Sequence, residues 1–408
     1  MKEVSLKRGM VVNSIGSLTG LGCQWLITIV VVRLANGFDD AGLYSLAMSV
    51  YGIFGPLAQY RMYTYQISDV KAENSTGEYM GIRILTSSGA LLLCVVYSVL
   101  TCPSSFLPII LLYGLFKTTG LVIDVLHACD QAHRRLEYIG ISLALQGVGS
   151  LVSFAVMMSV FGSLELALLG MVVATLLVGV LFDLPRTSRF DSLRPRFNSQ
   201  KIKRFLISCF PIVVAGVAVS ASTSLPRQYL SYAMGDAALG VYASVAAPVA
   251  LIQMGVSYIY NPLLGIFAEY YESNNRAAFT KLMGKTAAAM VVVGLGSAVA
   301  VSILGEPLLV LFYGTDIEGY AYLLLPMVML AIGTGWMWFL NDLLVALRVF
   351  KATFVTGAFA LVVSLLVIIP FVALWGLNGV TFACLLSCIV ASVVSLLYLV
   401  RHLRAHWV

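Results

Sequence analysis

Four basic side chains lie within or at the edges of long apolar stretches of the chain. Lys117 is in the middle of the run LLYGLFKTTGLVIDV, and Arg227 is in another apolar run. Arg33 and Arg61 lie nearer the ends of their stretches. A charged side chain at the centre of a membrane helix costs about 2.5–3.5 kcal/mol on insertion scales. Each of these positions therefore needs a physical reason.

Asp124 is the one acidic side chain that the pattern places deep in the same run as Lys117. Seven residues span about 10 Å along a helix axis, so a direct pair requires both side chains to lean together. Two interpretations stay open: a structural Lys–Asp pair, or separate groups facing a solvated cavity. Asp124 is also the candidate for coupling transport to H⁺ or Na⁺. No second His or Cys stands at ligand spacing from His127, so we expect no metal site.

The first apolar stretch carries a stripe of polar and small residues. Its members lie within about 80° of one another at 100° per residue. The stripe consists of Asn13, Ser17, Gly20, Gln24 and Thr28. Lipid offers such groups no hydrogen-bond partner, so the stripe faces other helices or water. Two interpretations of the stripe stay equally open: it packs against other helices, or it lines a cavity. In the second case Asn13 and Gln24 are candidate substrate contacts.

The elements that must position these residues are long apolar helices. Of 408 residues, 60% are hydrophobic and 11% charged, too few charges to cover a soluble protein of this length. Recurring runs of about twenty apolar residues predict an all-α, polytopic membrane protein rather than an alternating-strand barrel. Twelve helices are expected, at 9–34, 41–66, 82–100, 105–130, 138–160, 164–184, 205–230, 238–268, 286–304, 321–345, 352–373 and 377–400.

Basic residues gather at alternate ends of the predicted helices. With the N-terminus inside, 21 of the 25 Lys and Arg fall in the tails or inner loops, seven of them in 185–204. This asymmetry predicts that both termini lie in the cytoplasm. The net charge of +6 therefore indicates topology, and no nucleic-acid partner is expected. A lipid-headgroup or partner site is the alternative interpretation of 185–204. The seven cysteines include no CxxC pair, so no disulfide framework is expected.

A short motif recurs 198 residues along the chain. Gly37–Tyr44 and Gly235–Tyr242 both read G-x4-G-[LV]-Y, each at the turn before the second helix of a six-helix half. Because six is even, the halves share one orientation, which predicts two six-helix bundles related by pseudo-two-fold symmetry. We expect an N-terminal bundle at 1–184, a basic cytoplasmic linker at 185–204 and a C-terminal bundle at 205–408.

The charges in and near the predicted spans are mostly positive. Four cations stand against Asp124, while Asp342 and Asp69 lie towards inner ends. A cavity with surplus positive charge suits an anionic ligand, and a cation exporter is expected to show the opposite sign. The chain lacks a glycine-rich phosphate loop with Lys-Ser or Lys-Thr. No ATP-driven step within this chain, and no cofactor, is therefore expected.

Several of these features resemble a known family across nearly the whole chain. They are similar to the polysaccharide-repeat (O-antigen or capsule type) flippases of the multidrug/oligosaccharidyl-lipid/polysaccharide exporter superfamily. The features that carry the resemblance are Asn13, Arg33-Leu34, Gly42–Tyr44, Gln66, Asp69, Tyr79, Arg83, Leu225–Arg227, Gly240–Tyr242 and Leu308–Gly314.

The resemblance implies a transporter of the bacterial inner membrane, not an enzyme. Such a flippase moves an undecaprenyl-pyrophosphate-linked oligosaccharide from the cytoplasmic to the outer leaflet, for O-antigen (lipopolysaccharide) or capsule synthesis. Polysaccharide polymerase and chain-length proteins are the expected protein partners. Family members keep a cationic central cavity, which implies substrate contacts for Lys117, Arg227, Arg33 and Arg61.

Two other function classes are weighed against the flippase. A multidrug or small-solute antiporter of the same superfamily would bind cations or solutes through acidic residues. A polysaccharide polymerase or ligase is expected to carry a large outer loop with reactive polar residues. The longest outer connection here, about 305–320, contains no His, Lys or Arg, which disfavours the enzyme.

Overall fold

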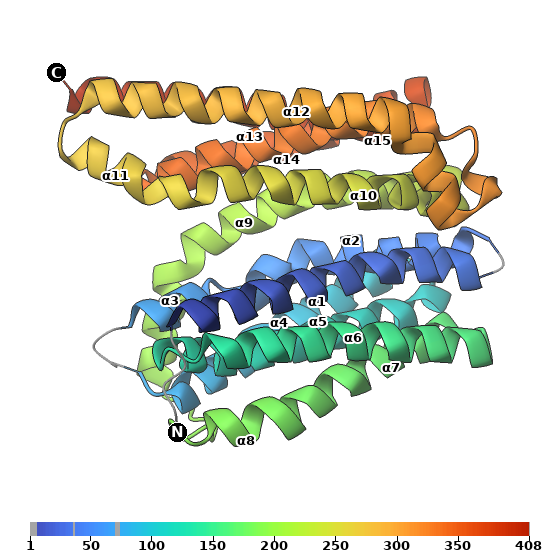
Figure 1. The fold of residues 1–408 in the computed structure, drawn as a ribbon, viewed down its shortest axis with the longest axis horizontal. Helices are drawn as coiled ribbons and strands as arrows, with labels where there is room; N and C mark the ends of the chain where they lie inside the picture. The colour runs from blue at the N-terminus through green and yellow to red at the C-terminus, as the bar shows by residue number, and fades with distance from the viewer. Residues whose placement is uncertain (1–5, 36, 70–73, 408) are drawn as a thin grey trace. The chain divides into compact units, whose positions relative to one another are not determined.

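The computed structural model describes residues 6–35, 37–69 and 74–407, which are almost entirely helical (Figure 1). Twelve helices in these ranges are long and apolar enough to cross a membrane. No strand occurs in the part of the chain that the structure describes. The expected all-α, polytopic fold is confirmed.

The chain forms two compact units, Met1–Val213 and Val214–Val408. The helices of the first unit are α1 (Leu6–Leu34), α2 (Asp39–Gln59), α3 (Met62–Ser68), α4 (Thr76–Thr101), η1 (Ser104–Phe106), α5 (Leu107–Ala132), α6 (Leu136–Phe161), α7 (Leu164–Val178), the π-helical turn η2 (Gly179–Asp183) and α8 (Leu184–Thr187). Helix α9 (Ser199–Met234) contains the limit between the units. The second unit continues with α10 (Asp236–Tyr260), η3 (Asn261–Leu263), α11 (Leu264–Glu272), α12 (Arg276–Tyr313), η4 (Thr315–Ile317), η5 (Ala321–Leu323), α13 (Leu324–Ala346), α14 (Phe350–Trp375) and α15 (Leu377–His406).

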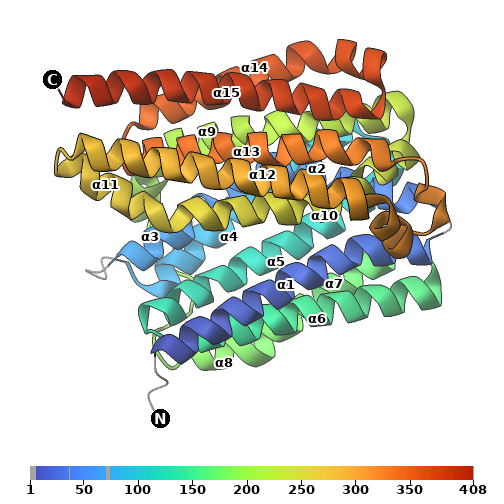
Figure 2. The same cartoon turned by 45° about the horizontal axis from the view of Figure 1, so that its top comes forward.

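Helix α1 runs beside α6 in close contact (Figures 1 and 2). A Cβ atom on Gly140 would lie 2.6 Å from the Cα of Asn13, and one on Gly147 would lie 2.7 Å from the Cα of Gly20. Small residues let membrane helices approach this closely, which supplies the packing contacts that hold them together in lipid. Part of the polar stripe on α1 is therefore used for helix packing.

The second predicted helix is broken between α2 and α3. Tyr60 and Arg61 have positive φ angles of 47° and 54°. Nη1 of Arg83 donates hydrogen bonds to the carbonyls of Ala58, at 2.8 Å, and Gln59, at 2.9 Å. These carbonyls belong to the end of α2, where a helix leaves its last acceptors unpaired. The sequence-based placement of Arg83 in an inner loop is wrong, because α2 supplies its partners inside the unit.

The basic segment 185–204 packs on the first turn of α4. Asp191 accepts a hydrogen bond from the backbone N–H of Thr76 at 2.8 Å. Nζ of Lys201 lies 2.8 Å from the carboxylate of Glu78, which also takes part in a capping box at the start of α4. The segment therefore lies within the first unit, and the limit between the units falls inside α9.

The repeated motif occupies corresponding turns in the two units. Gly37 precedes α2 with a φ of 135°, and Gly235 precedes α10 with a φ of 90°. Glycine adopts such angles without the steric cost that other residues incur. The tyrosines that end the motif, Tyr44 and Tyr242, are both buried. The motif thus has one structural role in both units: it begins a helix and anchors it in the core.

Candidate functional site

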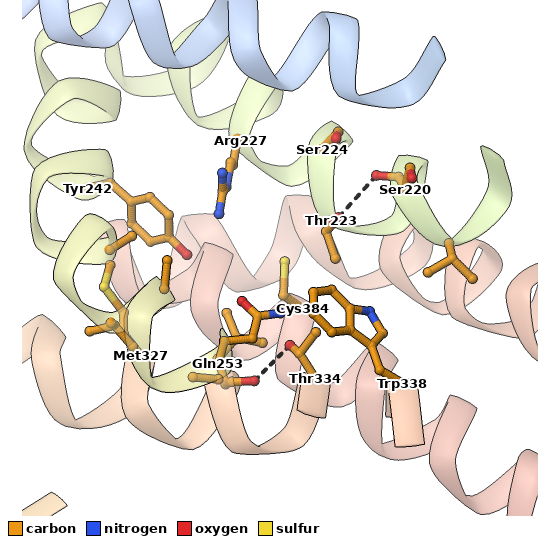
Figure 3. Close-up of a pocket in the computed structure, with 16 residues that line it drawn as sticks. Ser220, Thr223, Ser224, Arg227, Tyr242, Gln253, Met327, Thr334, Trp338 and Cys384 are labelled. Atoms are coloured by element: carbon orange, nitrogen blue, oxygen red, sulfur yellow. Dashed lines mark hydrogen bonds between the residues drawn. The ribbon is translucent and has the colours of Figure 1, made fainter. Parts of the chain in front are cut away.

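The guanidinium of Arg227 points into a cavity inside the second unit (Figure 3). The cavity has a volume of about 290 Å³ and is lined by residues of α9, α10, α13 and α15. None of the ion pairs found among the described residues includes Arg227. The cavity thus holds a cation whose charge is not neutralised by a carboxylate within 4.0 Å.

The rest of the lining combines hydroxyl groups, one amide and one indole ring with apolar side chains such as Val219, Met327 and Leu330. Gln253 of α10 and Trp338 of α13 lie across the cavity from Arg227 (Figure 3). The hydroxyls of Thr223 and Thr334 donate to backbone carbonyls of their own helices, so their oxygen atoms keep lone pairs that can accept. A guanidinium with acceptors, an amide and an aromatic face suits a ligand that carries a negative charge and hydroxyl groups.

Lys117 lies in the middle of α5 in the first unit and is half-buried. Its Nζ atom is 5.1 Å from the ring centroid of Phe116 and 5.5 Å from that of Tyr113. Aromatic rings at these distances stabilise a cation by about 0.5–2 kcal/mol. Within the described residues Lys117 forms no ion pair, so the direct Lys117–Asp124 contact is absent there.

A second cavity, of about 230 Å³, lies between α1, α5 and α6 of the first unit. Gln24 from the polar stripe of α1, Gln146 of α6 and Phe116 of α5 form part of its wall. The same Phe116 ring contacts the ammonium group of Lys117. Asn13 is not part of this lining and lies against Gly140 instead. The stripe therefore divides between helix packing and a cavity wall.

Arg33 and Arg61 line neither of these cavities. Both side chains are exposed, Arg33 at the end of α1 and Arg61 at the break before α3. Of the four predicted cations, Arg227 therefore lies in the cavity of the second unit. Lys117 lies against aromatic rings, one of which lines the cavity of the first unit.

The sequence analysis missed a buried acidic cluster in the first unit. Asp130, near the end of α5, is 0% exposed, and Asp183, in the π-helical turn, is 1% exposed. The statement that Asp124 is the only deep acid is therefore wrong. His127 lies between Asp124 and Asp183 and is itself buried. The spacing of Asp124, His127 and Asp130 at three residues each was a signal, since it puts all three near one face of a helix.

A comparison with known sequences gives one informative relative. No family model matches the chain. The chain is 24% identical over 296 residues to the capsular polysaccharide biosynthesis protein CapF of Staphylococcus aureus, which covers 72% of this chain and 74% of CapF.

Solved structures of transporters share the fold over nearly the whole chain. An inward-facing multidrug resistance MATE family transporter of the MOP superfamily superposes with a TM-score of 0.72 at 14% identity, covering 98% of both chains. The lipid II flippase MurJ, in an inward closed conformation, gives 0.71 at 12% identity over 98% of this chain and 89% of its own. A MOP superfamily transporter from Pyrococcus furiosus gives 0.66 at 14% identity over 99% and 97%. These likenesses show the fold that the chain shares with such transporters.

Proposed function

We propose that this chain, which has the fold of the MOP superfamily transporters, is a flippase for a lipid-linked oligosaccharide. Its substrate would be an undecaprenyl-pyrophosphate-linked repeat unit, moved from the cytoplasmic to the outer leaflet for capsule or O-antigen synthesis. The name of the relative CapF supports a role in surface polysaccharide synthesis. The membrane would be the bacterial inner membrane, with both termini in the cytoplasm.

The observation that carries this proposal is the cavity around Arg227. Among the described residues its cation has no carboxylate partner within 4.0 Å, and the wall around it includes hydroxyl groups, Gln253 and Trp338 as well as apolar side chains. Ligand pockets for drug-sized molecules hold about 300–1,000 Å³. A cavity of about 290 Å³ therefore suits one phosphate or sugar unit at the head of a larger substrate, not a complete oligosaccharide.

Transport would proceed by alternating access without covalent chemistry. Arg227 would neutralise the pyrophosphate in the cavity of the second unit, while the prenyl chain stays in the bilayer. Lys117 would be a further substrate contact in the first unit. Because the cytoplasmic side of the membrane is electrically negative, outward movement of an anion is favourable by about 2.3 kcal/mol per charge per 100 mV. Coupling to H⁺ or Na⁺ through Asp124 would be an additional source of free energy for transport. Polymerase and chain-length proteins would receive the product on the outer side.

The test measures surface polysaccharide in a strain whose own copy of the gene is deleted and replaced by variants at equal protein level. We expect Arg227→Ala and Lys117→Ala each to lower output at least tenfold, which corresponds to about 1.4 kcal/mol. Arg227→Lys keeps the charge but loses the planar fork, so an intermediate output is expected. Arg189→Ala removes an exposed cation of the linker and is the matched control. Full output from both alanine variants would remove these side chains as substrate contacts.

Lipids that co-purify with the protein test the substrate class directly. Mass spectrometry of the wild-type protein should detect a polyprenyl diphosphate carrying sugars, and the Arg227→Ala protein should retain less of it. Recovery of ordinary phospholipids alone, in equal amounts from both proteins, would contradict the proposed substrate.

A second candidate is a cation-coupled antiporter for drugs or small solutes. The buried acids Asp130 and Asp183 favour it, because carboxylates bind organic cations. Drug-susceptibility assays distinguish the candidates. An antiporter raises resistance to cationic compounds and leaves surface polysaccharide unchanged when it is deleted, whereas a flippase does the reverse.

A further inference from the structure

Both ring nitrogens of His127 face carboxylates. Nε2 lies 3.4 Å from Oδ1 of Asp183, and Nδ1 lies 3.9 Å from Oδ1 of Asp124. The side chains of His127 and Asp183 are 3% and 0% exposed, whereas that of Asp124 is 38% exposed. Three residues from α5 and η2 thus form a line that begins at an accessible acid and ends at a fully buried one.

This geometry is suited to the binding of one additional proton. A neutral imidazole has one N–H donor and one nitrogen lone pair. With both acids ionised, that lone pair would face a carboxylate. One additional proton, on the imidazole or on one of the acids, removes that conflict. Within the described residues, Nε2 of His127 and Oδ1 of Asp183 are buried and have no hydrogen-bond partner, so both keep unused hydrogen-bonding capacity.

Other polar groups hold the inner acid in place. The hydroxyl of Ser142 on α6 donates to Oδ2 of Asp183 at 2.8 Å, and Nε2 of Gln146 donates to Ser142 at 2.9 Å. Gln146 and Gln24 both line the cavity of the first unit. Hydrogen bonds therefore connect Asp183 to this cavity, and ion-pair distances of 3.4 and 3.9 Å connect Asp183 through His127 to Asp124.

Further charged and titratable groups surround the cluster. Asp130 interacts electrostatically with His127, Asp183 and His133, and its Oδ1 accepts a hydrogen bond from Thr187 at 3.0 Å. Arg83 of α4 and Tyr63 of α3 interact electrostatically with Asp124. Arg83 already donates to two carbonyls of α2, so it is not available as a direct partner for the inner acid. His127 is thus the basic side chain that lies beside the carboxylate of Asp183.

We propose that Asp124, His127 and Asp183 form a proton-binding site in the first unit, with Asp124 as its accessible side. A proton from water reaches Asp124 and passes to Nδ1 of His127, while Nε2 releases its proton to Oδ1 of Asp183. No other reactant is needed, and the proton returns along the same atoms. Through Ser142 and Gln146, the protonation state of Asp183 influences the side chains that line the cavity. The site does not depend on which substrate the protein carries.

The site favours a proton over Na⁺ for a structural reason. Alkali and alkaline-earth cations are hard and bind to several oxygen atoms at once. The central group here presents nitrogen to both acids, and the carboxylates of Asp124 and Asp183 are held on opposite sides of the ring. No group of three or more candidate metal ligands was found in the described ranges, 6–35, 37–69 and 74–407.

The test records charge movement in proteoliposomes on a solid-supported membrane after a rapid pH jump, without any substrate. The wild-type protein should give a transient current. We expect Asp183→Asn, His127→Gln and Asp124→Asn each to reduce the displaced charge at least fivefold. Asp316→Asn removes an exposed acid far along the chain and should leave the current unchanged. Thermal unfolding and gel filtration verify that each variant is folded.

Three outcomes overturn the proposal. A full current in both Asp124→Asn and Asp183→Asn shows that these acids do not bind the proton. An equal loss in Asp316→Asn shows that the current reports surface charge. A current evoked by a Na⁺ jump at constant pH and lost in Asp183→Asn assigns the site to Na⁺. If the buried variants do not fold, Asp124→Asn decides alone, because its side chain is partly exposed. Loss of the proton current with normal polysaccharide output separates this site from the proposed flippase function.

Discussion

Gly16 of α1 and Gly140 of α6 lie in direct backbone contact, so that no side chain fits between them. A Cβ atom on Gly16 would collide with the carbonyl group of Gly140, and one on Gly140 would collide with the backbone of the preceding turn of α1. Gly20, four residues after Gly16, makes the next close approach, since a Cβ atom placed on it would lie 3.1 Å from the carbonyl oxygen of Leu143. Residues Gly16 and Gly20 therefore form a G-x3-G contact surface, which brings Gln24 to the cavity wall one turn later.

Replacement of Gly140 by alanine tests this contact. We expect Gly140→Ala to lower the free energy of unfolding by about 1–3 kcal/mol, the usual cost of overpacking. Thermal unfolding in detergent, followed through Trp25 on α1, measures the change. Gly22→Ala is the control, because a Cβ at Gly22 meets no atom within 4 Å and alanine favours helix. Equal destabilisation by both substitutions would show that the contact has no special role.

Arg83 is expected to stabilise the break between α2 and α3. Arg83→Met keeps the apolar length but removes both guanidinium hydrogen bonds, which leaves the carbonyl of Gln59 without this donor and that of Ala58 with the hydroxyl of Thr86 alone. Hydrogen bonds to a charged group contribute about 1.5–3 kcal/mol each, so a loss of about 3 kcal/mol is expected. Chemical unfolding measures it. The exposed Arg189→Met should change stability by less than about 0.5 kcal/mol, and a similar small effect at Arg83 would contradict the assignment.

The packing of 185–204 on α4 should weaken in acid. Burial raises the pKa of Asp191, but hydrogen bonds from Thr76 and Ser192 outweigh it, and the pKa lies below its ordinary value. Such a group stabilises the folded state fully above the ordinary carboxyl pKa of about 3.9. This contribution is lost as the pH falls through the lowered value. Hydrogen-exchange protection of this segment should therefore decrease below about pH 4.

Asp191→Asn is the corresponding variant. It should lower the hydrogen-exchange protection of 185–204 at neutral pH. It should also make this protection less dependent on pH in acid, since no carboxylate is left to titrate at this position. Asp316→Asn, in the turn before α13, should leave the protection of 185–204 unchanged at every pH. Unchanged acid dependence in Asp191→Asn would assign the effect to another acid.

The indole of Trp338 should contribute to substrate transport. Removal of the ring in Trp338→Ala should lower polysaccharide output about two- to tenfold, from the 0.5–1.5 kcal/mol that an aromatic contact adds. Trp338→Phe keeps an aromatic face and should retain most of the output. Trp375→Ala, on α14 and outside the cavity lining, is the control. Identical output from all three variants would exclude a role for the ring.

The helices could be predicted because their signal is local. Apolar length alone identifies twelve spans, and the glycines at Gly37 and Gly235 mark turns that need positive φ. The ends were less predictable: α12 runs from Arg276 to Tyr313, whereas hydropathy indicates 286–304. The first turns of α12, from Arg276 to Lys285, carry three basic residues, and such turns continue a helix into water without an apolar signal. At the other end, Glu306 and Pro307 interrupt the apolar run, although the helix continues.

The site could be predicted only in part. Lys117 and Arg227 stand out because each is a charge within an apolar run, but the cavity around Arg227 is formed by α9, α10, α13 and α15 together. Arg83 and Asp183 were missed because they lie near the ends of runs, where a charge normally meets water. Their burial depends on α2 and α5 respectively, and no local pattern contains that information.

The π-helical turn Gly179–Asp183 holds one residue more than a regular helix would place there. Five π-helical residues turn the chain by nearly the same angle as four α-helical ones, so the extra residue is absorbed without rotating the residues that follow it. Asp183 therefore keeps its direction towards His127, and Thr187 keeps its direction towards Asp130. A single codon gained or lost within this turn would thus change the local backbone hydrogen bonds and leave the cluster on the same face of the helix.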